Sequence, residues 1–247
     1  MIIKHPWDTA PLQLLWAEAF GDDAGFISAF LSTGFSPDRC RCVEANGAAA
    51  ALYWFDCLCQ GKKLAYLYGI ATRKDLRGQG LCKALMEDTH RYLKGQGYAG
   101  CVLVPAQESL RQYYRRFGYA DFGGIREMTV SATTPVAVRS IDPEEYAALR
   151  QGCLPAGGVE LGGDMLAFFS KLAKFYAGDG FVFAVSQENG KWILPELLGE
   201  CPDFGGVAAA LGAKELTVRI PGDTPFAMYL PLEAHPTAPT YFGIALD

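Results

Sequence analysis

Apolar positions recur with helical and strand periods in a regular order along the first half of the chain. Helical spacing covers residues 12–20 and 26–35. Two strand-like runs then flank Asn46-Gly47, and Asn-Gly is a strong hairpin signal. The segment KKLAYLYGIAT, residues 62–72, has an aromatic and β-branched bias that predicts a buried strand. The first half therefore begins as two helices followed by a sheet.

The clearest helical pattern follows that strand, over residues 81–94. Its packed face would carry Leu81, Cys82, Leu85, Met86, Thr89, Tyr92 and Leu93. Charged residues fall on the opposite face, so we expect one side to pack and the other to meet water. After the glycines near residue 95, residues 99–106 predict another strand. Residues 108–119 predict a short helix that ends at Gly118.

A domain boundary is predicted near SATTPVAVRS, residues 131–140, where the pattern restarts. It divides the chain into residues 1–134 and residues 135–247. Asp142 followed by Pro143 predicts the start of a new helix, because aspartate is a favoured N-cap and proline fits the first helical position.

The second half repeats the order of the first: two helices, a hairpin, a helix and strands. The predicted elements are helices at 142–150, 164–178 and near 204–211, a hairpin about Asn189-Gly190, and strands at 215–220 and 241–247. We interpret this order as a weak internal duplication. Where the first half has DLRGQGLCKALMED, the second has GECPDFGGVAAALG, with acids and a proline in place of arginine and glycine.

Composition and charge narrow the class of protein. With 247 residues and 50% of them hydrophobic, the chain can bury a substantial core in one large or two modest domains. No apolar run approaches the roughly 20 residues of a membrane helix, and the N-terminus lacks the apolar core of a signal peptide. We therefore expect a cytoplasmic protein with no membrane partner. A net charge of -5 without a basic tract argues against a nucleic-acid partner.

The eight cysteines allow a metal site as one interpretation. Cys40 and Cys42, like Cys57 and Cys59, are C-x-C pairs, and in strands each pair would project from one face, so four sulfurs could meet. The usual zinc spacing is C-x-x-C, and the chain has three histidines. We therefore expect no metal and no disulfide framework, and most cysteines to be core residues.

The loop DLRGQGLCKALMED, residues 75–88, carries the candidate chemistry. A helix N-terminus offers unpaired N–H groups and partial positive charge to an anion. Gly78 and Gly80 permit positive φ and a close approach of phosphate, and Arg77 adds charge. This loop matches neither the P-loop pattern nor the dinucleotide-binding G-x-G-x-x-G pattern. A diphosphate held by successive amides is one interpretation of the loop, and an ordinary tight turn is the other.

This loop, placed between a buried strand and an amphipathic helix, resembles the acetyl-coenzyme A loop R-x-x-G-x-[GA] of the GNAT superfamily of N-acetyltransferases. The matching residues are Arg77, Gly78, Gln79, Gly80, Leu81 and Cys82, with Cys82 in place of the family's glycine or alanine. A second family element, Y-x-x-x-G-[FY], matches Tyr114 to Tyr119. Gln107 stands where the family often has asparagine.

The resemblance implies an α/β (α+β) fold, the GNAT fold, in which helices flank a central mixed, mostly antiparallel sheet. Residues 1–134 would be the acetyl-CoA-binding domain. Residues 135–247 would be a second, degenerate GNAT-like half that lacks the pyrophosphate loop, as in tandem-GNAT proteins such as the acetyltransferase part of the enhanced intracellular survival proteins.

The resemblance also implies an N-acetyltransferase with acetyl-CoA as cosubstrate and an amine of a small molecule or protein as acceptor. Backbone groups of Ile70, Ala71 and Thr72 would bind the pantetheine arm, and the loop amides of residues 77–82 would bind the pyrophosphate. Tyr114 would protonate the departing thiolate as general acid. Tyr113 beside it is a competing candidate.

The general base and the acceptor stay open at this stage. Candidate bases are Tyr68, Asp56, Glu127 and the terminal carboxylate at Asp247. An acid-rich acceptor site would require Asp56, Glu127, Glu160 and Asp164 to converge. A coenzyme-binding sensor without turnover is a different possible function. An aminoacyl transferase of the tandem-GNAT kind, which uses charged tRNA, is another, and the acidic balance counts against it. The sequence leaves the oligomeric state undetermined.

Overall fold

The structure of the protein, a computed structural model, describes residues 2–6, 8–188, 190–234 and 236–246. The first half contributes β1 (Ile3–Lys4), α1 (Ala10–Phe20), α2 (Ala24–Thr33), β2 (Cys40–Glu44), β3 (Ala48–Cys59), β4 (Lys62–Thr72), α3 (Leu81–Gly95), β5 (Gly100–Leu103), α4 (Glu108–Arg115) and β6 (Ala120–Ser131), with 3₁₀ turns at Pro37–Arg39 and Lys74–Leu76. The second half contributes β7 (Arg139–Ile141), α5 (Pro143–Cys153), α6 (Gly163–Leu172), β8 (Lys174–Gly178), β9 (Phe181–Glu188), β10 (Lys191–Gly199), α7 (Phe204–Ala210), β11 (Glu215–Pro221) and β12 (Thr224–Pro231).

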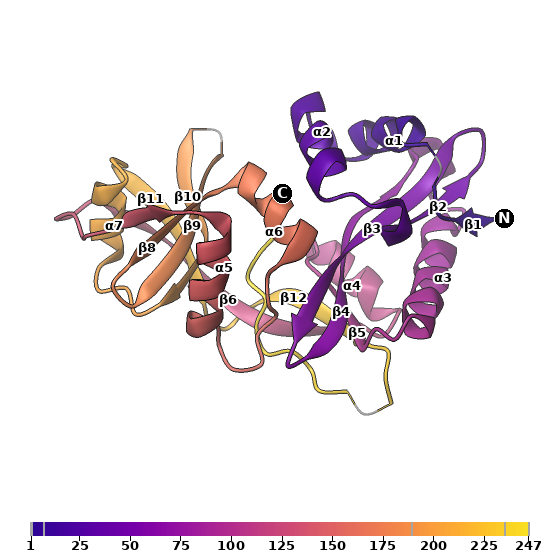
Figure 1. Ribbon diagram of the computed structural model, residues 1–247. Helices are drawn as coiled ribbons and strands as arrows, with labels where there is room; N and C mark the ends of the chain where they lie inside the picture. Colours follow the sequence, from indigo (N-terminus) through magenta and orange to yellow (C-terminus); the bar gives the residue numbers. More distant parts are fainter. Residues whose placement is uncertain (1, 7, 189, 235, 247) are drawn as a thin grey trace.

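The strands form one mixed sheet, in the order β1-β2-β3-β4-β5-β12-β6-β11-β10-β9-β8-β7 (Figure 1). Among the described strands, β4 pairs in parallel with β5, β10 pairs in parallel with β11, and the other pairings are antiparallel. Helices flank this sheet. The predicted α/β class with a mixed, mostly antiparallel sheet is therefore confirmed.

The two halves of the chain contribute interleaved strands to the centre of the sheet. Strand β12 lies between β5 and β6, and β6 in turn pairs with β11. On one side of the central β12·β6 pair, β12 pairs antiparallel with β5, and β5 pairs in parallel with β4. On the other side, β6 pairs antiparallel with β11, and β11 pairs in parallel with β10. This pseudo-symmetric order is what an internal duplication would produce. The division into domains 1–134 and 135–247 stays a prediction.

Side chains of β3 alternate between two apolar cores, because successive residues of a strand point to opposite faces. Tyr53 and Phe55 pack in the core that contains Trp16 of α1, whereas Leu52 and Trp54 pack in the core beneath α3. Because helices cover both faces of the sheet at β3, most of this strand is buried and its sequence is almost continuously apolar. The same arrangement fixes β4, its neighbour, in the interior.

Two predictions for helices and strands are corrected. The helix predicted over 164–178 ends at Leu172, and Lys174–Gly178 is strand β8, paired with β9. Alternate burial of Phe175 and Ala177 in that ladder outweighs the local helical preference. The strand predicted at 241–247 is also wrong for the described residues, where Tyr241 forms an isolated bridge with Gly158.

Strands β6 and β12 were not predicted from the sequence. Most of β6 is half-buried or exposed, so it lacks a clean alternation of apolar and polar residues. Proline at position 225 and glycines at positions 123 and 124 are unfavourable strand residues that further obscure both segments. Long-range pairing, rather than local pattern, makes these residues into the central strands of the sheet.

The C-x-C pairs lie in the core. Cys40, Cys42, Cys57 and Cys59 are buried, and all eight cysteines are free thiols. Burial raises the pKa of Cys57 to about 12, so this thiol stays protonated. Over the described ranges, no group of three or more His, Cys, Asp or Glu side chains is placed to hold a metal ion. None of the described helices is both long and apolar enough to cross a membrane.

Burial of His90 makes the stability of the protein depend on pH. Desolvation on the inner side of α3 lowers the pKa of His90 to about 4, and its Nε2 lies 2.9 Å from the Tyr119 hydroxyl. In the unfolded chain the pKa of this histidine is near 6.5, so below that pH the unfolded chain binds more protons than the folded chain. Stability should therefore fall as pH falls from about 6.5 towards 4, by about 3 kcal/mol in total from this group.

A proton NMR titration of the His90 ring would measure this directly, with His90→Gln identifying the resonance. Above pH 5 we expect less than about a tenth of the ring to be protonated in the folded protein. A midpoint near 6.5 would contradict the buried, neutral assignment. Unfolding of the His90→Gln variant should show a smaller loss of stability between pH 6.5 and 4.

Candidate active site

Strands β4 and β5 separate towards the loop that follows β4. They pair through residues 64–66 of β4 and residues 100–102 of β5. Beyond that point, within the described chain, no ladder joins the two strands. A cavity of about 300 Å³, here called the first cavity, is lined on one side by residues 66–70 and on the other by Leu103 and Val104. The opening therefore lies at the carboxyl ends of a parallel pair, where α/β proteins commonly bind ligands.

A β-bulge in β4 borders the first cavity. The register with β3 passes from Tyr53 opposite Tyr68 to Ala51 opposite Ala71, so β4 has one extra residue here. Gly69 has φ of +57°, and a Cβ at this position would lie 2.8 Å from the Trp16 ring. A larger residue would therefore clash. Bulges disrupt the ladder locally and are common next to active sites, and this one lies in the cavity wall.

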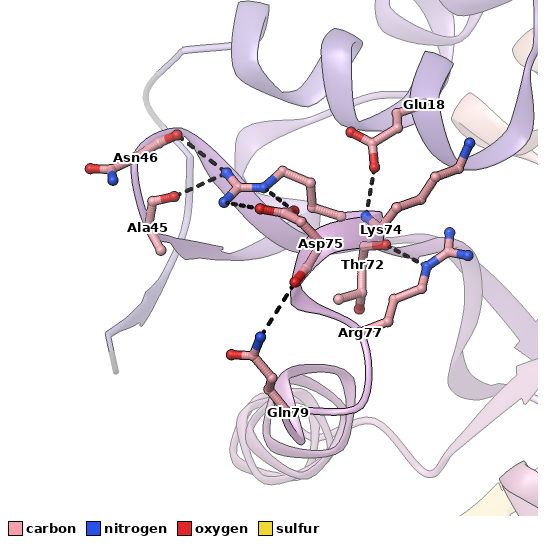
Figure 2. A network of polar contacts seen from close by, with 9 residues as sticks. Glu18, Ala45, Asn46, Thr72, Lys74, Asp75, Arg77 and Gln79 are labelled. Carbon is pink, nitrogen blue, oxygen red and sulfur yellow. Dashed lines mark hydrogen bonds and ion pairs between the residues drawn. The ribbon is translucent and has the colours of Figure 1, made fainter.

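The loop after β4 is fixed by Arg73. Its guanidinium donates to the Asp75 carboxylate at 2.7 and 3.2 Å and to the carbonyls of Ala45 and Asn46 at 3.1 and 3.3 Å (Figure 2). The next backbone amide along the chain donates to Glu18 of α1 at 2.6 Å. The hydrogen bond from Arg73 lowers the pKa of Asp75. These contacts hold the loop against the β2–β3 turn and α1 without using Arg77.

Arg77 and the two glycines border open space. Arg77 Nε donates to the Thr72 carbonyl at 3.1 Å, and the terminal nitrogens of its guanidinium have no partner among the described residues (Figure 2). Gly78 and Gly80 have φ of +77° and +79°, and a Cβ at either would meet no atom within 4 Å. Gly80 is the N-cap of α3, and no described side chain caps it. The first amides of α3 are thus available to an anion.

The other predicted coenzyme-binding residues surround this loop. Ile70 lines the first cavity, whereas Ala71 is buried in the ladder with β3. The Gln79 side chain turns back to donate to the Asp75 carbonyl at 3.4 Å (Figure 2). Leu81 is the first residue of α3. The structure therefore brings the predicted residues of β4 and the loop together at one end of the opening.

Helix α4 carries the two candidate tyrosines, and they have different surroundings. Tyr114 lines the first cavity and is 7% exposed. Burial raises its pKa above the ordinary value for tyrosine, with a smaller contribution from Cys82. Tyr113 does not belong to the described lining of this cavity, and burial raises its pKa, with a smaller contribution from Cys82. The geometry therefore favours Tyr114 as the group that meets a ligand.

Asp22 is a cavity residue that was not predicted from the sequence. It lines the first cavity and accepts a 2.7 Å hydrogen bond from Trp16 Nε1. The residue lies in the short link between α1 and α2, a position with no periodic or motif signal. Only the fold shows that Asp22 lies beside aromatic residues in the cavity wall.

The candidate bases are dispersed. Tyr68 lines the first cavity and donates to the Leu246 carbonyl. Asp56 instead accepts from Tyr98 at 2.5 Å and belongs to neither cavity wall in the described structure. Asp247 lies outside the described residues, although Ala245 and Leu246 just before it line the first cavity.

A second cavity, of about 610 Å³, adjoins the first. Four residues belong to both walls: Phe26, Val104, Ala106 and Ala245. Much of the remaining wall comes from β9, β10, β11 and α6 of the second half. Of the four acids that could have formed an acidic cleft, Glu127 lines this cavity, whereas Asp164 pairs with Arg39 on another surface. An acid-rich cleft made by all four is therefore not formed.

Helix α7, the counterpart of α3 in the second half, has a different N-terminus. Asp203 caps it, since its carboxylate accepts from the Gly205 amide at 2.9 Å. A Cβ at Gly205 or Gly206 would lie 2.6 Å from other atoms of the protein. This helix start is therefore capped and packed, whereas that of α3 is uncapped and open.

Residues 11–122 match the family model described as an acetyltransferase (GNAT) domain. No curated protein matches the sequence. Among solved structures, a GCN5-related N-acetyltransferase from Anabaena variabilis is similar at 13% identity and a TM-score of 0.72, over 94% of this chain and 73% of that one. A GCN5-related N-acetyltransferase from Kribbella flavida is similar at 16% identity and a TM-score of 0.68, over 92% and 70% of the two chains.

A putative acetyltransferase from Pyrococcus horikoshii is similar over 99% of this chain and 94% of that one, at 15% identity and a TM-score of 0.66. Identities this low show a shared fold, and the family model adds the sequence match. Residues 11–122 match an acetyltransferase (GNAT) domain in sequence, and over most of its length the chain shares the fold of these N-acetyltransferases.

Proposed function

We propose that the protein is an acetyl-CoA-dependent N-acetyltransferase that acetylates a primary amine. The observation that carries this proposal is the position of the uncapped, glycine-lined start of α3 beside the opening between β4 and β5. One extended ligand could place its diphosphate on the loop and its thioester arm along β4. The GNAT family match supports the same chemistry.

The loop and β4 would position the coenzyme. Amides at residues 77–82, with the free terminal nitrogens of Arg77, would bind the diphosphate. Backbone groups of Ile70, Ala71 and Thr72 would bind the pantetheine arm, and the bulge in β4 would turn some of them into the cavity. We propose that residues 1–134 carry this site and that residues 135–247 are a degenerate GNAT-like half, as the capped start of α7 suggests.

Acetyl-CoA would supply a thioester whose carbonyl carbon forms the new C–N bond with the acceptor amine as the C–S bond breaks. Tyr114 would hold the proton that the departing sulfur takes up. Its raised pKa keeps this hydroxyl protonated at neutral pH. Asp22, which faces the same cavity, would attract the acceptor ammonium and accept its proton directly or through water.

Substitution of Gly80 tests the diphosphate site. Gly80→Asp puts a negative charge and a side chain into the open space at the start of α3, so acetyl-CoA binding measured by calorimetry should weaken about tenfold to hundredfold. Gly97→Asp is the matched control. Gly97 also has φ of +79°, and a Cβ there would likewise meet no atom within 4 Å, but this residue follows the other end of α3.

The control should bind acetyl-CoA within about twofold of the native protein, since it adds the same charge and backbone strain far from the loop. Equal losses in the two variants would contradict a site at Gly80. No binding by the folded native protein at millimolar acetyl-CoA would remove the proposed function. Binding without thiol release to any amine would favour a sensor over an enzyme.

A further inference from the structure

The second cavity carries one cation and one anion on adjacent strands. Glu127 of β6 and Arg219 of β11 are direct cross-strand partners, and Arg219 Nη2 donates to Glu127 Oε2 at 3.0 Å. They are the charged residues of the cavity's described wall. Their side chains are 50% and 21% exposed, so both remain accessible while paired. The guanidinium also lies 5.0 Å from the centre of the Phe226 ring, which fixes its plane.

Two further polar atoms of this wall are buried without a partner. They are Arg219 Nε and Ser186 Oγ, which have no hydrogen bond to any described residue. An arginine nitrogen can only donate a hydrogen bond, and a serine hydroxyl can donate or accept one. A buried donor is costly when it stays unpaired. Both atoms are enclosed beneath the cavity surface, so a ligand in the cavity meets the accessible part of the Arg219 side chain.

The charge balance of this wall selects against singly charged head groups. A lone carboxylate near Arg219 would also meet the Glu127 charge, and a lone ammonium near Glu127 would also meet Arg219. A head group with both charges is complementary to the pair, because each ligand charge then faces its opposite. The head group of an α-amino acid has this pattern.

The route between the two cavities is largely apolar. The shared wall consists of Phe26, Val104, Ala106 and Ala245, and Phe169 and Phe226 extend it into the second cavity. A methylene chain fits such a wall, since it leaves no polar group unpaired. A ligand with its head group at Glu127 and Arg219 could therefore extend a second amine into the first cavity.

We propose that the acceptor is a diamino acid of the lysine type, bound by its α-ammonium at Glu127 and its α-carboxylate at Arg219, with its side-chain amine in the first cavity. This inference rests on the proposed N-acetyltransferase function and names the substrate class. The side-chain nitrogen forms the bond to the acetyl carbon and loses one proton, while the coenzyme sulfur leaves and gains one. The product is an amide at the side-chain nitrogen, and the head group is unchanged.

Three acceptors of matched chain length test the head-group assignment by thiol release from acetyl-CoA. L-Lysine carries both head-group charges, 1,5-diaminopentane lacks the carboxylate, and 6-aminohexanoate lacks the α-ammonium. For the native full-length chain we expect kcat/KM for lysine at least about tenfold above that for either analogue, because each missing group leaves a charged partner unpaired.

Two variants should then change the preference in opposite ways. Arg219→Met retains an unbranched apolar chain over Phe226. It should abolish the preference for lysine over 1,5-diaminopentane. Glu127→Gln should abolish the preference for lysine over 6-aminohexanoate. Arg126→Met, at an exposed residue next to Glu127 that is outside the described wall of the second cavity, is the control and should leave both ratios within about twofold.

The inference is overturned if the native protein uses either analogue as well as lysine, or if Arg219→Met and Glu127→Gln leave the ratios unchanged. If acetyl-CoA gives no thiol release with any amine, calorimetry with the same three compounds decides the question. Lysine binding at least about tenfold tighter than that of both analogues would support the head-group site while the proposed reaction fails. Equal or undetectable binding would overturn the site itself.

Discussion

Replacing Tyr114 by phenylalanine is expected to lower kcat for acetyl transfer by about 10²- to 10⁴-fold, the usual contribution of a positioned general acid. Tyr114 lines the first cavity and is 7% exposed, so the variant loses one hydroxyl at the reaction site and keeps the buried ring. Acetyl-CoA binding should change little, because the loop at residues 77–82 holds the diphosphate in our proposal. Steady-state thiol release with calorimetry on the same samples would separate the two quantities.

Tyr113→Phe is the matched control for this prediction. It removes the same atom from the adjacent residue, which does not belong to the described wall of the first cavity. We expect a less than about fivefold change in kcat, as for the loss of a single hydrogen bond away from the reacting atoms. Equal effects of the two substitutions, or an unchanged kcat in Tyr114→Phe, would show that Tyr114 is not the acid.

The raised pKa of Tyr114 adds a pH signature. An acid works only while it holds its proton, and burial moves the loss of that proton to higher pH. The rate should therefore show no decline assigned to Tyr114 below pH 10. If the rate of the native protein declines below pH 10 and that decline is absent in Tyr114→Phe, the buried environment of Tyr114 is contradicted.

Local chemistry made the candidate coenzyme loop predictable. Arg77, Gly78 and Gly80 provide charge, positive φ and a helix start, and each of these properties depends on a few adjacent residues. The strand before the loop and the helix after it were predictable for the same reason, since each has its own periodic pattern. The structure places all of them at one end of the opening between β4 and β5.

The proposed acceptor side of the site could not be predicted in this way. Glu127 and Arg219 are 92 residues apart in sequence and meet because β6 pairs with β11 across the two halves of the chain. From the sequence, Glu127 was a candidate base and one of four acids of a possible acid-rich acceptor site, and Arg219 was not a candidate. Asp22 reaches the first cavity from a link between helices that has no motif. Such positions depend on the sheet order, which local patterns do not specify.

Strand β12 illustrates the same limit for the fold. Its central place between β5 and β6 depends on two long-range ladders, and its neighbour β6 lacks a clear alternating pattern. By contrast, the predicted N-cap at Asp142 is confirmed, because its carboxylate accepts from the Glu145 amide three residues on. Short-range contacts were recovered from sequence, and long-range pairings were not.

A buried ion pair in the second half should give the largest effect on stability. Arg150 of α5 and Glu196 of β10 are each 1% exposed, and Arg150 donates to both carboxylate oxygens at 2.6 and 2.9 Å. Tyr146 and Tyr241 donate to the same carboxylate at 3.0 and 3.1 Å. Glu196→Ala would leave the Arg150 charge buried without its partner, so we expect a loss of about 3–5 kcal/mol in the free energy of unfolding.

Urea unfolding of Glu196→Ala and of the double variant Arg150→Met, Glu196→Leu would test the origin of this loss. The double variant removes both charges and refills the volume, so it should recover most of the stability lost by the single variant. If the double variant is as unstable as Glu196→Ala, the loss comes from packing and the hydroxyl bonds rather than from an unpaired charge. A loss below about 1 kcal/mol in Glu196→Ala would contradict the buried pair.

The same network should also affect the active site through Tyr241. Its hydroxyl is held by Glu196, and the segment that follows it supplies Ala245 and Leu246 to the wall of the first cavity. In the double variant, Tyr241 loses its carboxylate acceptor while the charge balance of the core is kept. We therefore expect a higher KM for the acceptor in this variant even where its stability is recovered, with acetyl-CoA binding at the distant loop unchanged. An unchanged KM would show that packing of the segment, including the contact between Phe242 and Tyr66, is enough to hold the cavity wall.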